Sequence, residues 1–341
     1  MFNRAHIIPS VSKGGAEKIL SKVIEVSEET CVVLVFKRSV HEIKIKAEVV
    51  KLFSIKGIHV AYQIVQRGTP VSAWLYSAYL FGMLLKLLNS KIPLTLHVRN
   101  GRPFKLSHNV MLSAVRLFSY VSSTNIKAVF NSDSSLRAHR KYIYRFPVEV
   151  VHNGVDYNSR LNFNKFSESN LNVLIVALFR EEKRYDKMLA VISHFNDHTD
   201  INFHIAGPSP NEIRKLAEDL SFEFDNCKLY GRLEDVDFLY QRCQVNLLLS
   251  DTESFSNVIL ESAVHGLYNV VSNVGDSHLI VKDSGVLVTN VSEAIDAIKE
   301  YKSAPLDFRL EKAKNIRETV ETDFDAKIQM TKLLRAELCV E

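Results

Sequence analysis

Short apolar runs separated by segments of helical periodicity fill the first 160 residues. Their length and β-branched content predict buried strands at residues 5–9, 30–36, 48–53, 57–62, 92–98, 128–132 and 148–152. A helix is predicted at residues 70–88, between two of these strands. Strands that alternate with helices are typical of a doubly wound parallel sheet.

The same alternation returns after residue 170. Strands are predicted at residues 172–177, 201–206, 227–231 and 245–249, with edge elements at 269–272 and 285–288 and a charged helical stretch at 308–338. Residues 157–170 are rich in Asn and Ser, which favours a linker. Because 341 residues exceed what one hydrophobic core usually serves, we expect two domains.

Charge is distributed unequally along the chain. The net charge is +4, but residues 1–160 hold 23 Lys and Arg against 9 Asp and Glu, a net +14, which leaves −10 for the remainder. A basic half could meet nucleic acid, an anionic membrane or a charged substrate. Because the basic residues are not clustered with aromatic ones, we expect a membrane surface or a phosphate-bearing lipid and no nucleic acid. Ordinary surface charge is the alternative.

Residues 68–85 contain no charged residue and approach the length of a spanning helix. Gly68, Pro70 and Gly82 interrupt the stretch and a strand pattern follows it, so we interpret it as a buried crossover helix, with a spanning or interfacial helix as alternatives. The N-terminus lacks the apolar core of a signal peptide. The cysteines are scattered and indicate neither a zinc site nor a disulfide framework, so the expected compartment is the cytoplasm; they are Cys31, Cys227, Cys243 and Cys339.

Residues 250–266 follow a predicted strand and are expected to form a loop, a short helix and a stop. The candidate N-cap residues are Thr252, Ser254 and Ser256. An apolar face at helical spacing follows, formed by Leu260, Ala263 and Val264. Gly266 is expected to end the helix.

The polar residues of this segment form a second pattern. Asn257, Glu261 and His265 recur every four residues on one side of the helix, and Glu253 lies in the loop before it. Amides at a helix N-terminus bind anions, and ionised carboxylates accept hydrogen bonds from hydroxyl groups. The segment therefore predicts a site for a ligand with phosphate and hydroxyl groups, unless it is simply a capped surface helix.

Other polar or glycine-bearing motifs lie at the ends of predicted strands, where doubly wound sheets bind ligands. In chain order they are Gly14-Gly15-x-Glu17, His97, Asn131-Ser132, Asn153-Gly154-Val155-Asp156, Lys183 and Gly231.

Together with Glu253-x7-Glu261, these motifs resemble in identity and order those of the retaining glycosyltransferases of family 4. The resemblance covers nearly the whole chain and departs from the family at Leu178, where an arginine is usual. It implies an α/β GT-B fold of two Rossmann-like doubly wound domains facing a central cleft. An acceptor-side domain would occupy residues 1–160 and a nucleotide-sugar domain 170–308, with a helical segment at 309–341 crossing back to the first.

The resemblance also implies residue roles. Glu253 would hold the donor sugar's hydroxyls and His97 would lie beside the reacting centre, both as catalytic residues. Lys183 would bind the donor diphosphate, with Arg180 supplying the second cation. The diphosphate would also contact Ser254, Phe255, Ser256, Asn257, Gly14 and Gly15, and the nucleoside would contact Glu261, Gly231, Arg232 and Leu233.

The expected function is that of a hexosyltransferase acting on a nucleotide sugar, expected to be UDP-linked, without a metal or other cofactor. The acceptor would be a glycan or lipid-linked saccharide in bacterial surface polysaccharide or lipopolysaccharide synthesis. Two alternatives remain: a GT-B-like epimerase or phosphorylase, and a glycan-binding protein without activity, which Leu178 favours.

Overall fold

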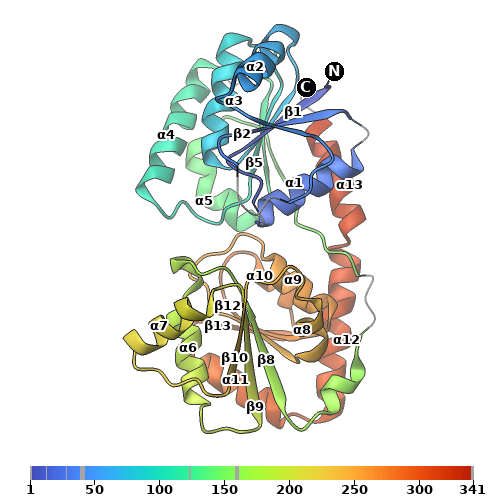
Figure 1. The fold of residues 1–341 in the computed structure, drawn as a ribbon. Helices are drawn as coiled ribbons and strands as arrows, with labels where there is room; N and C mark the ends of the chain where they lie inside the picture. The colour runs from blue at the N-terminus through green and yellow to red at the C-terminus, as the bar shows by residue number, and fades with distance from the viewer. Residues whose placement is uncertain are drawn as a thin grey trace. The chain divides into compact units, whose positions relative to one another are not determined.

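The computed structural model describes residues 2–12, 14–27, 29–38, 43–122, 124–157 and 161–338. The chain divides into two compact units. The first consists of Met1–Asn153 with Ala326–Glu341, and the second of Gly154–Asp325. Each unit is built on a parallel sheet with helices on both faces (Figure 1).

The first unit has a seven-stranded sheet in the order β3-β2-β1-β4-β5-β6-β7. Its strands are β1 (Arg4–Ile8), β2 (Cys31–Val35), β3 (Glu48–Lys51), β4 (Val71–Trp74), β5 (Leu94–Val98), β6 (Ile126–Phe130) and β7 (Val148–Val150). One face is covered by α2 (Ile55–Arg67), α3 (Tyr76–Leu88), α4 (Leu106–Val121) and α5 (Asp133–Ile143). The other face is covered by α1 (Gly15–Val26) and α13 (Ala326–Leu338).

The second unit has a six-stranded sheet in the order β10-β9-β8-β11-β12-β13. Its strands are β8 (Leu171–Val176), β9 (Ile201–Ala206), β10 (Cys227–Gly231), β11 (Val245–Leu248), β12 (Tyr268–Ser272) and β13 (Gly285–Val288). Its helices are η1 (Phe163–Ser167), η2 (Glu181–Lys183), α6 (Tyr185–His194), α7 (Pro210–Asp219), α8 (Asp237–Arg242), α9 (Asn257–Val264), α10 (Ser277–Val281), α11 (Val291–Ser303) and α12 (Leu306–Asp323). Every paired strand is parallel, as the near-continuous apolar runs predict.

Two predictions in the first unit are wrong. Residues 57–62 form part of helix α2 rather than a strand, because the Ser54 hydroxyl caps the helix by accepting from the Gly57 amide at 3.0 Å. Residues 70–88 are a strand and a helix rather than one helix. The backbone turns at Leu75, whose φ is 69°, and this turn separates β4 from α3.

The second half differs from expectation in three places. Of the two predicted edge elements, β12 is an interior strand and β13 lies at an edge. The predicted linker includes the short helix η1, which packs on the second unit. Phe166 is buried there, and Lys165 donates to the carbonyls of Tyr240 and His265 at 2.9 and 2.8 Å. Residues 158–160 of the predicted linker lie outside the described ranges. The predicted terminal helical stretch is two helices, of which α12 belongs to the second unit and α13 packs on α1 in the first (Figure 1).

No helix in the described ranges combines the length and the apolar character needed to cross a bilayer.

Candidate functional site

Two loops meet at the carboxyl edge of the second sheet. They follow the neighbouring strands β8 and β11 and span residues 177–184 and 249–256. The Asp251 amide donates to the Glu182 carbonyl at 2.9 Å. Arg184 Nη1 donates to both carboxylate oxygens of Asp251, at 3.0 and 3.1 Å. Because adjacent parallel strands end at the same edge of a sheet, these bonds join the two loops into one surface.

This surface brings Lys183 and Glu253 together. Lys183 Nζ lies 2.5 Å from Glu253 Oε1, which also accepts from the Ser250 hydroxyl at 2.8 Å. The Lys183 and Glu253 side chains are only 20% and 12% exposed. A partly desolvated cation beside a carboxylate can bind a phosphate and a hydroxyl of the same ligand.

Three charged residues beside this pair were missed by the sequence analysis: Arg184, Lys187 and Asp251. Arg184 has a left-handed backbone with a φ of 50° and also binds Asp186 at 2.6 Å. Lys187 Nζ donates to Asp251 at 2.9 Å. Burial alone would raise the pKa of Asp251, but the hydrogen bonds from Lys187 and Arg184 hold it below its ordinary value. The run of charges in the sequence could not distinguish this network from a solvated turn.

Arg180, expected to supply the second cation, is mostly in solvent. Its side chain is 59% exposed, and Nη1 lies 3.8 Å from Glu182 Oε1. Arg184 is bound to two carboxylates. Lys183 is therefore the cation that the loops hold closest to Glu253.

Helix α9 begins directly after the Glu253 loop. Ser256 is its N-cap residue, but the Ser256 side chain makes no capping hydrogen bond among the described residues. Ser254, Phe255 and Ser256 are buried, and Phe255 packs on Phe324 with ring centroids 5.1 Å apart. The predicted apolar face and the glycine stop are confirmed, since Gly266 has a φ of 71°. The backbone amides around Asn257 thus start a helix at the loop that carries Glu253.

Glu261 and His265 lie on the side of α9 that faces α8. Glu261 accepts from the buried Tyr240 hydroxyl at 3.2 Å. His265 Nε2 lies 3.0 Å from Asp237 Oδ1, and its ring stacks on Tyr240 at 5.4 Å between centroids. Burial lowers the pKa of His265 to about 4, so the imidazole is neutral at physiological pH.

The segment predicted to contact a nucleoside lies at the same edge of the sheet. Gly231 ends β10 with a φ of 69°, and its carbonyl accepts from the Gly207 amide at 2.8 Å. Gly207 in turn packs against the Ala177 carbonyl at the end of β8. Arg232 is exposed and Leu233 is half-buried.

Gly275 supports the Glu253 loop from the end of β12. Its φ is 64°, and an added Cβ would lie 2.7 Å from the carbonyl oxygens of both Glu253 and Ser254. For the nucleotide-sugar donor that the resemblance implies, we expect Gly275→Ala to displace this loop and to reduce donor turnover by more than tenfold, in addition to a left-handed backbone cost of roughly 1–2 kcal/mol. Donor hydrolysis and thermal unfolding would measure the two effects.

Gly68→Ala is the matched control for this prediction. Gly68 has a φ of 65°, but its Cβ would meet nothing nearer than 3.7 Å. Equal loss of turnover in both variants would show that Gly275 does not act through the loop.

The glycine pair of the first unit, Gly14 and Gly15, begins helix α1. Gly14 is the N-cap residue with an extended backbone, and the Glu17 carboxylate folds back over it. Glu17 accepts from the Ser12 hydroxyl at 2.9 Å. Lys13, within the same motif, lies outside the described residues. The motif forms a turn in which an added Cβ at Gly14 would displace the end of the Glu17 side chain.

His97 has no exposed surface, which does not support its predicted contact with a sugar. Its ring stacks on Trp74 with centroids 3.9 Å apart and planes 4° from parallel, and Nε2 lies 2.7 Å from Glu337 Oε1 of α13. Burial lowers the pKa of His97. Arg99, two residues on, donates to Asn153 Oδ1 at 3.0 Å. His97 thus takes part in the packing of α13 on the sheet.

Two Asp-x-Asp triplets occur, at residues 235–237 and 323–325. Such triplets can hold a divalent metal on a diphosphate, but here one carboxylate of each triplet is bound by a neighbouring side chain. Asp237 lies beside His265, and Asp323 accepts from Lys282 Nζ at 2.7 Å.

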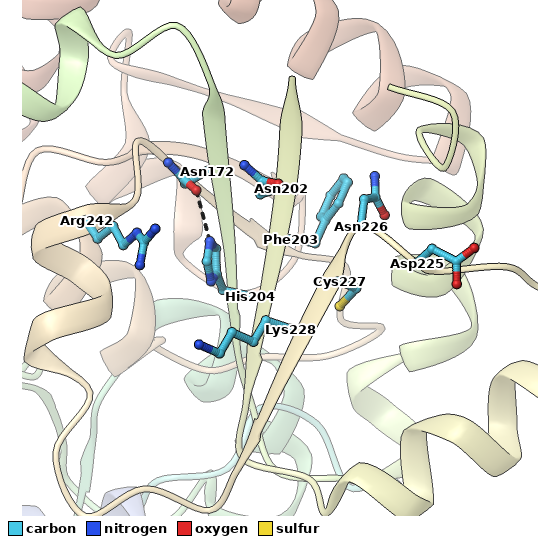
Figure 2. A pocket seen from close by; sticks show the side chains of 9 residues that line it. All are labelled: Asn172, Asn202, Phe203, His204, Asp225, Asn226, Cys227, Lys228 and Arg242. Carbon is cyan, nitrogen blue, oxygen red and sulfur yellow. Dashed lines mark hydrogen bonds between the residues drawn. The ribbon is translucent and has the colours of Figure 1, made fainter. Parts of the chain in front are cut away.

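A polar hollow of about 390 Å³ lies at the opposite edge of the second sheet, near the amino ends of β8, β9 and β10 (Figure 2). His204 bonds Asn172 Oδ1 at 3.0 Å and the Tyr230 hydroxyl at 2.9 Å within it. Burial, with Arg242 and Lys228 nearby, lowers the pKa of His204 to about 4. The hollow contains none of the predicted site residues. It is lined by Asn172, Asn202, Phe203, His204, Asp225, Asn226, Cys227, Lys228 and Arg242.

Comparison with known sequences finds a family match within the second unit and a curated relative. Residues 170–302 match the family model described as Glycosyl transferases group 1. A protein of Klebsiella pneumoniae described as an uncharacterized 41.2 kDa protein in the cps region is 26% identical over 189 residues, or 52% of this chain and 51% of that protein. The chain therefore spans about half the length of this curated relative.

Solved structures share the fold over the whole chain. HepE of Anabaena in complex with UDP-glucose superposes with a TM-score of 0.79 at 17% identity, covering 99% of each chain. WaaG, a glycosyltransferase involved in lipopolysaccharide biosynthesis, superposes with a TM-score of 0.73 at 14% identity, covering 98% of this chain and all of that one. The two-unit α/β fold is that of the GT-B glycosyltransferase structures.

Proposed function

We propose that this chain is a retaining glycosyltransferase that moves a hexose from a UDP-linked donor to a glycan or lipid-linked saccharide of a bacterial surface polysaccharide. The observation that carries the proposal is the 2.5 Å pairing of Lys183 with Glu253 at the carboxyl edge of a sheet, inside the segment that matches the family model. The UDP-glucose complex of HepE supports the donor class. The cps-region relative and WaaG support the pathway.

The proposed chemistry follows from the charge that develops on the leaving group. As the glycosidic bond breaks, UDP gains negative charge, and fixed donors aimed at its phosphates stabilise the transition state more than the ground state. Lys183 and the first amides of α9 supply that countercharge in this proposal, without a metal. Glu253 exchanges its contact with Lys183 for the sugar hydroxyls.

We propose retention by attack on the same face of the sugar. A double displacement places two carboxyl groups about 5–5.5 Å apart, one as nucleophile and one as acid. Glu253 instead lies against Lys183 and the Ser250 hydroxyl. The slow hydrolysis of nucleotide sugars by the protein tests retention. A panel of donors is incubated with the protein, and ¹H NMR identifies which anomer of the sugar is released before it mutarotates. Release of the donor's own anomer is expected, and release of the opposite anomer would exclude retention.

The alternative is a protein that binds a nucleotide sugar without transferring it. Leu178 in place of an arginine favours this function, because Arg184 is already bound to Asp251 and Asp186. Calorimetric donor binding without hydrolysis or transfer would establish it.

We expect Glu261→Ala to weaken UDP binding by about tenfold, since a hydrogen bond to a charged group contributes roughly 1.5–3 kcal/mol. In the proposal Glu261 holds the ribose hydroxyls. Tyr240→Phe is the control, because it removes the hydroxyl group that donates to Glu261 at 3.2 Å and keeps the carboxylate. Calorimetry on both variants measures the effect, and an unchanged dissociation constant for Glu261→Ala would exclude the ribose contact.

A further inference from the structure

The outward side of helix α4 in the first unit is apolar, although its inward side already packs on the sheet. Leu112 and Val115 are buried inward. Five large side chains face solvent at exposures of 54–80%, and they are Leu106, Val110, Leu117, Tyr120 and Val121. At 100° per residue these five lie within an arc of about 100° on the outward side of the helix, which they share with Ser113.

The neighbouring helices extend this surface. α2, α3 and α4 cover the same face of the sheet, and α3 packs against both of the others (Figure 1). Each presents an outward apolar stripe of its own at helical spacing. The exposed residues are Ile55, Ile58 and Tyr62 on α2 and Leu80, Leu84, Leu87 and Leu88 on α3. Large exposed apolar surface on neighbouring helices is typical of an interaction site.

The charge around these stripes is predominantly positive, although Glu48 at the start of β3 pairs with Lys56 of α2. Residues 49–132 contain ten Lys and Arg and no Asp or Glu. The exposed cations among them are Lys51, Lys56, Arg67, Lys91, Arg102, Lys105 and Arg116. A partner for this surface must therefore be apolar in its interior and anionic at its surface.

The far end of the α4 stripe carries an aromatic and cationic cluster. The Tyr144 hydroxyl donates to the Tyr120 hydroxyl at 2.6 Å. Arg145 lies 4.9 Å over the Tyr120 ring and Arg116 lies 5.8 Å over the Tyr144 ring. Tyrosines with flanking Arg are enriched at membrane–water interfaces, where the ring meets the acyl boundary and the cation meets phosphate.

We propose that the outward face of α2, α3 and α4 binds the surface of an anionic lipid bilayer, with α4 lying in the interface. This surface is separate from the proposed catalytic residues of the second unit, so it goes beyond the proposed function. The basic half of the sequence led us to expect a membrane contact, and the proposal assigns that contact to particular side chains.

Co-sedimentation with lipid vesicles tests the proposal. One set of vesicles is phosphatidylcholine alone, and the other contains about 30% phosphatidylglycerol, which is anionic. The full chain is expected to partition at least about tenfold more strongly onto the anionic vesicles, and added salt should weaken that binding. Val110→Ser with Leu117→Ser should reduce binding by about tenfold. Arg102→Glu with Lys105→Glu should remove the preference for anionic lipid.

Val26→Ser with Ile328→Ser is the matched control. Both residues are exposed apolar side chains of the first unit, at 56% and 50%, but on α1 and α13 at the other face of the sheet. The control should bind vesicles as the unchanged chain does, and thermal unfolding should confirm that all variants fold.

Equal binding by the α4 variant and the control would overturn the proposal, as would the absence of any preference for anionic vesicles. A dimer in ultracentrifugation that the α4 variant dissociates would assign the face to a second copy of the chain instead. Donor hydrolysis by these variants is independent of every outcome, so failure here would leave the proposed function standing.

Discussion

Glu253→Gln is expected to lower donor turnover by about 10²-fold or more while changing donor affinity much less. The amide keeps the shape of the side chain but loses the charge that orients the sugar hydroxyls as the bond breaks. It also leaves Lys183 without the carboxylate now 2.5 Å away. Steady-state hydrolysis of the preferred nucleotide sugar gives kcat and KM separately.

Glu181→Gln is the control for this variant. Glu181 is an exposed carboxylate in the same loop as Lys183, and its neutralisation changes the local charge by the same amount. Both variants are expected to fold alike. Wild-type kcat in Glu253→Gln, or equal losses in the two variants, would remove Glu253 from the reaction.

Lys183→Met is expected to weaken donor binding by about 10- to 100-fold and to lower turnover as well. Methionine preserves the aliphatic stem and removes the ammonium group that would bind the diphosphate. Because the Lys183 side chain is only 20% exposed, water cannot fully replace its charge. Calorimetry with UDP and with uridine separates the effects, since uridine lacks the diphosphate and its binding should be unchanged.

Arg180→Met tests whether the second expected cation shares this task. Its side chain is 59% exposed, so we expect a change of less than about threefold in the UDP dissociation constant. If Arg180→Met weakens binding more than Lys183→Met does, then Arg180 moves onto the diphosphate and the assignment of Lys183 as the principal cation is wrong.

Sequence patterns predicted the second unit well because its strands are short apolar runs bounded by polar residues. The run at β11, the apolar face of α9 and the left-handed Gly266 all follow from periodicity and glycine stereochemistry. The first unit was predicted less well. β4 and most of α3 lie in one stretch without charged residues, at residues 71–85. The turn between them depends on an uncommon positive φ at Leu75, where the sequence has no glycine.

The candidate site was also predicted only in part from the sequence. The resemblance assigned Lys183 and Glu253 to the same donor, one to its diphosphate and the other to its sugar, and the structure brings the two side chains together. The network of Arg184, Lys187 and Asp251 was not, because which neighbouring charges bind one another depends on how two loops far apart in sequence meet. The role of His97 came from the resemblance, and its burial could not be read from the sequence because one of its contacts is Glu337, about 240 residues later in the chain.

Hydrogen exchange in the presence of UDP tests most directly where the second unit binds a nucleotide. Amides in residues 178–184 and 250–260 are expected to gain protection, because they form the carboxyl edge that holds Lys183 and Glu253. Amides at residues 202–204 and 225–228, which line the polar hollow at the opposite edge, should be unchanged. Protection at the hollow with none in the two loops would contradict the proposed site.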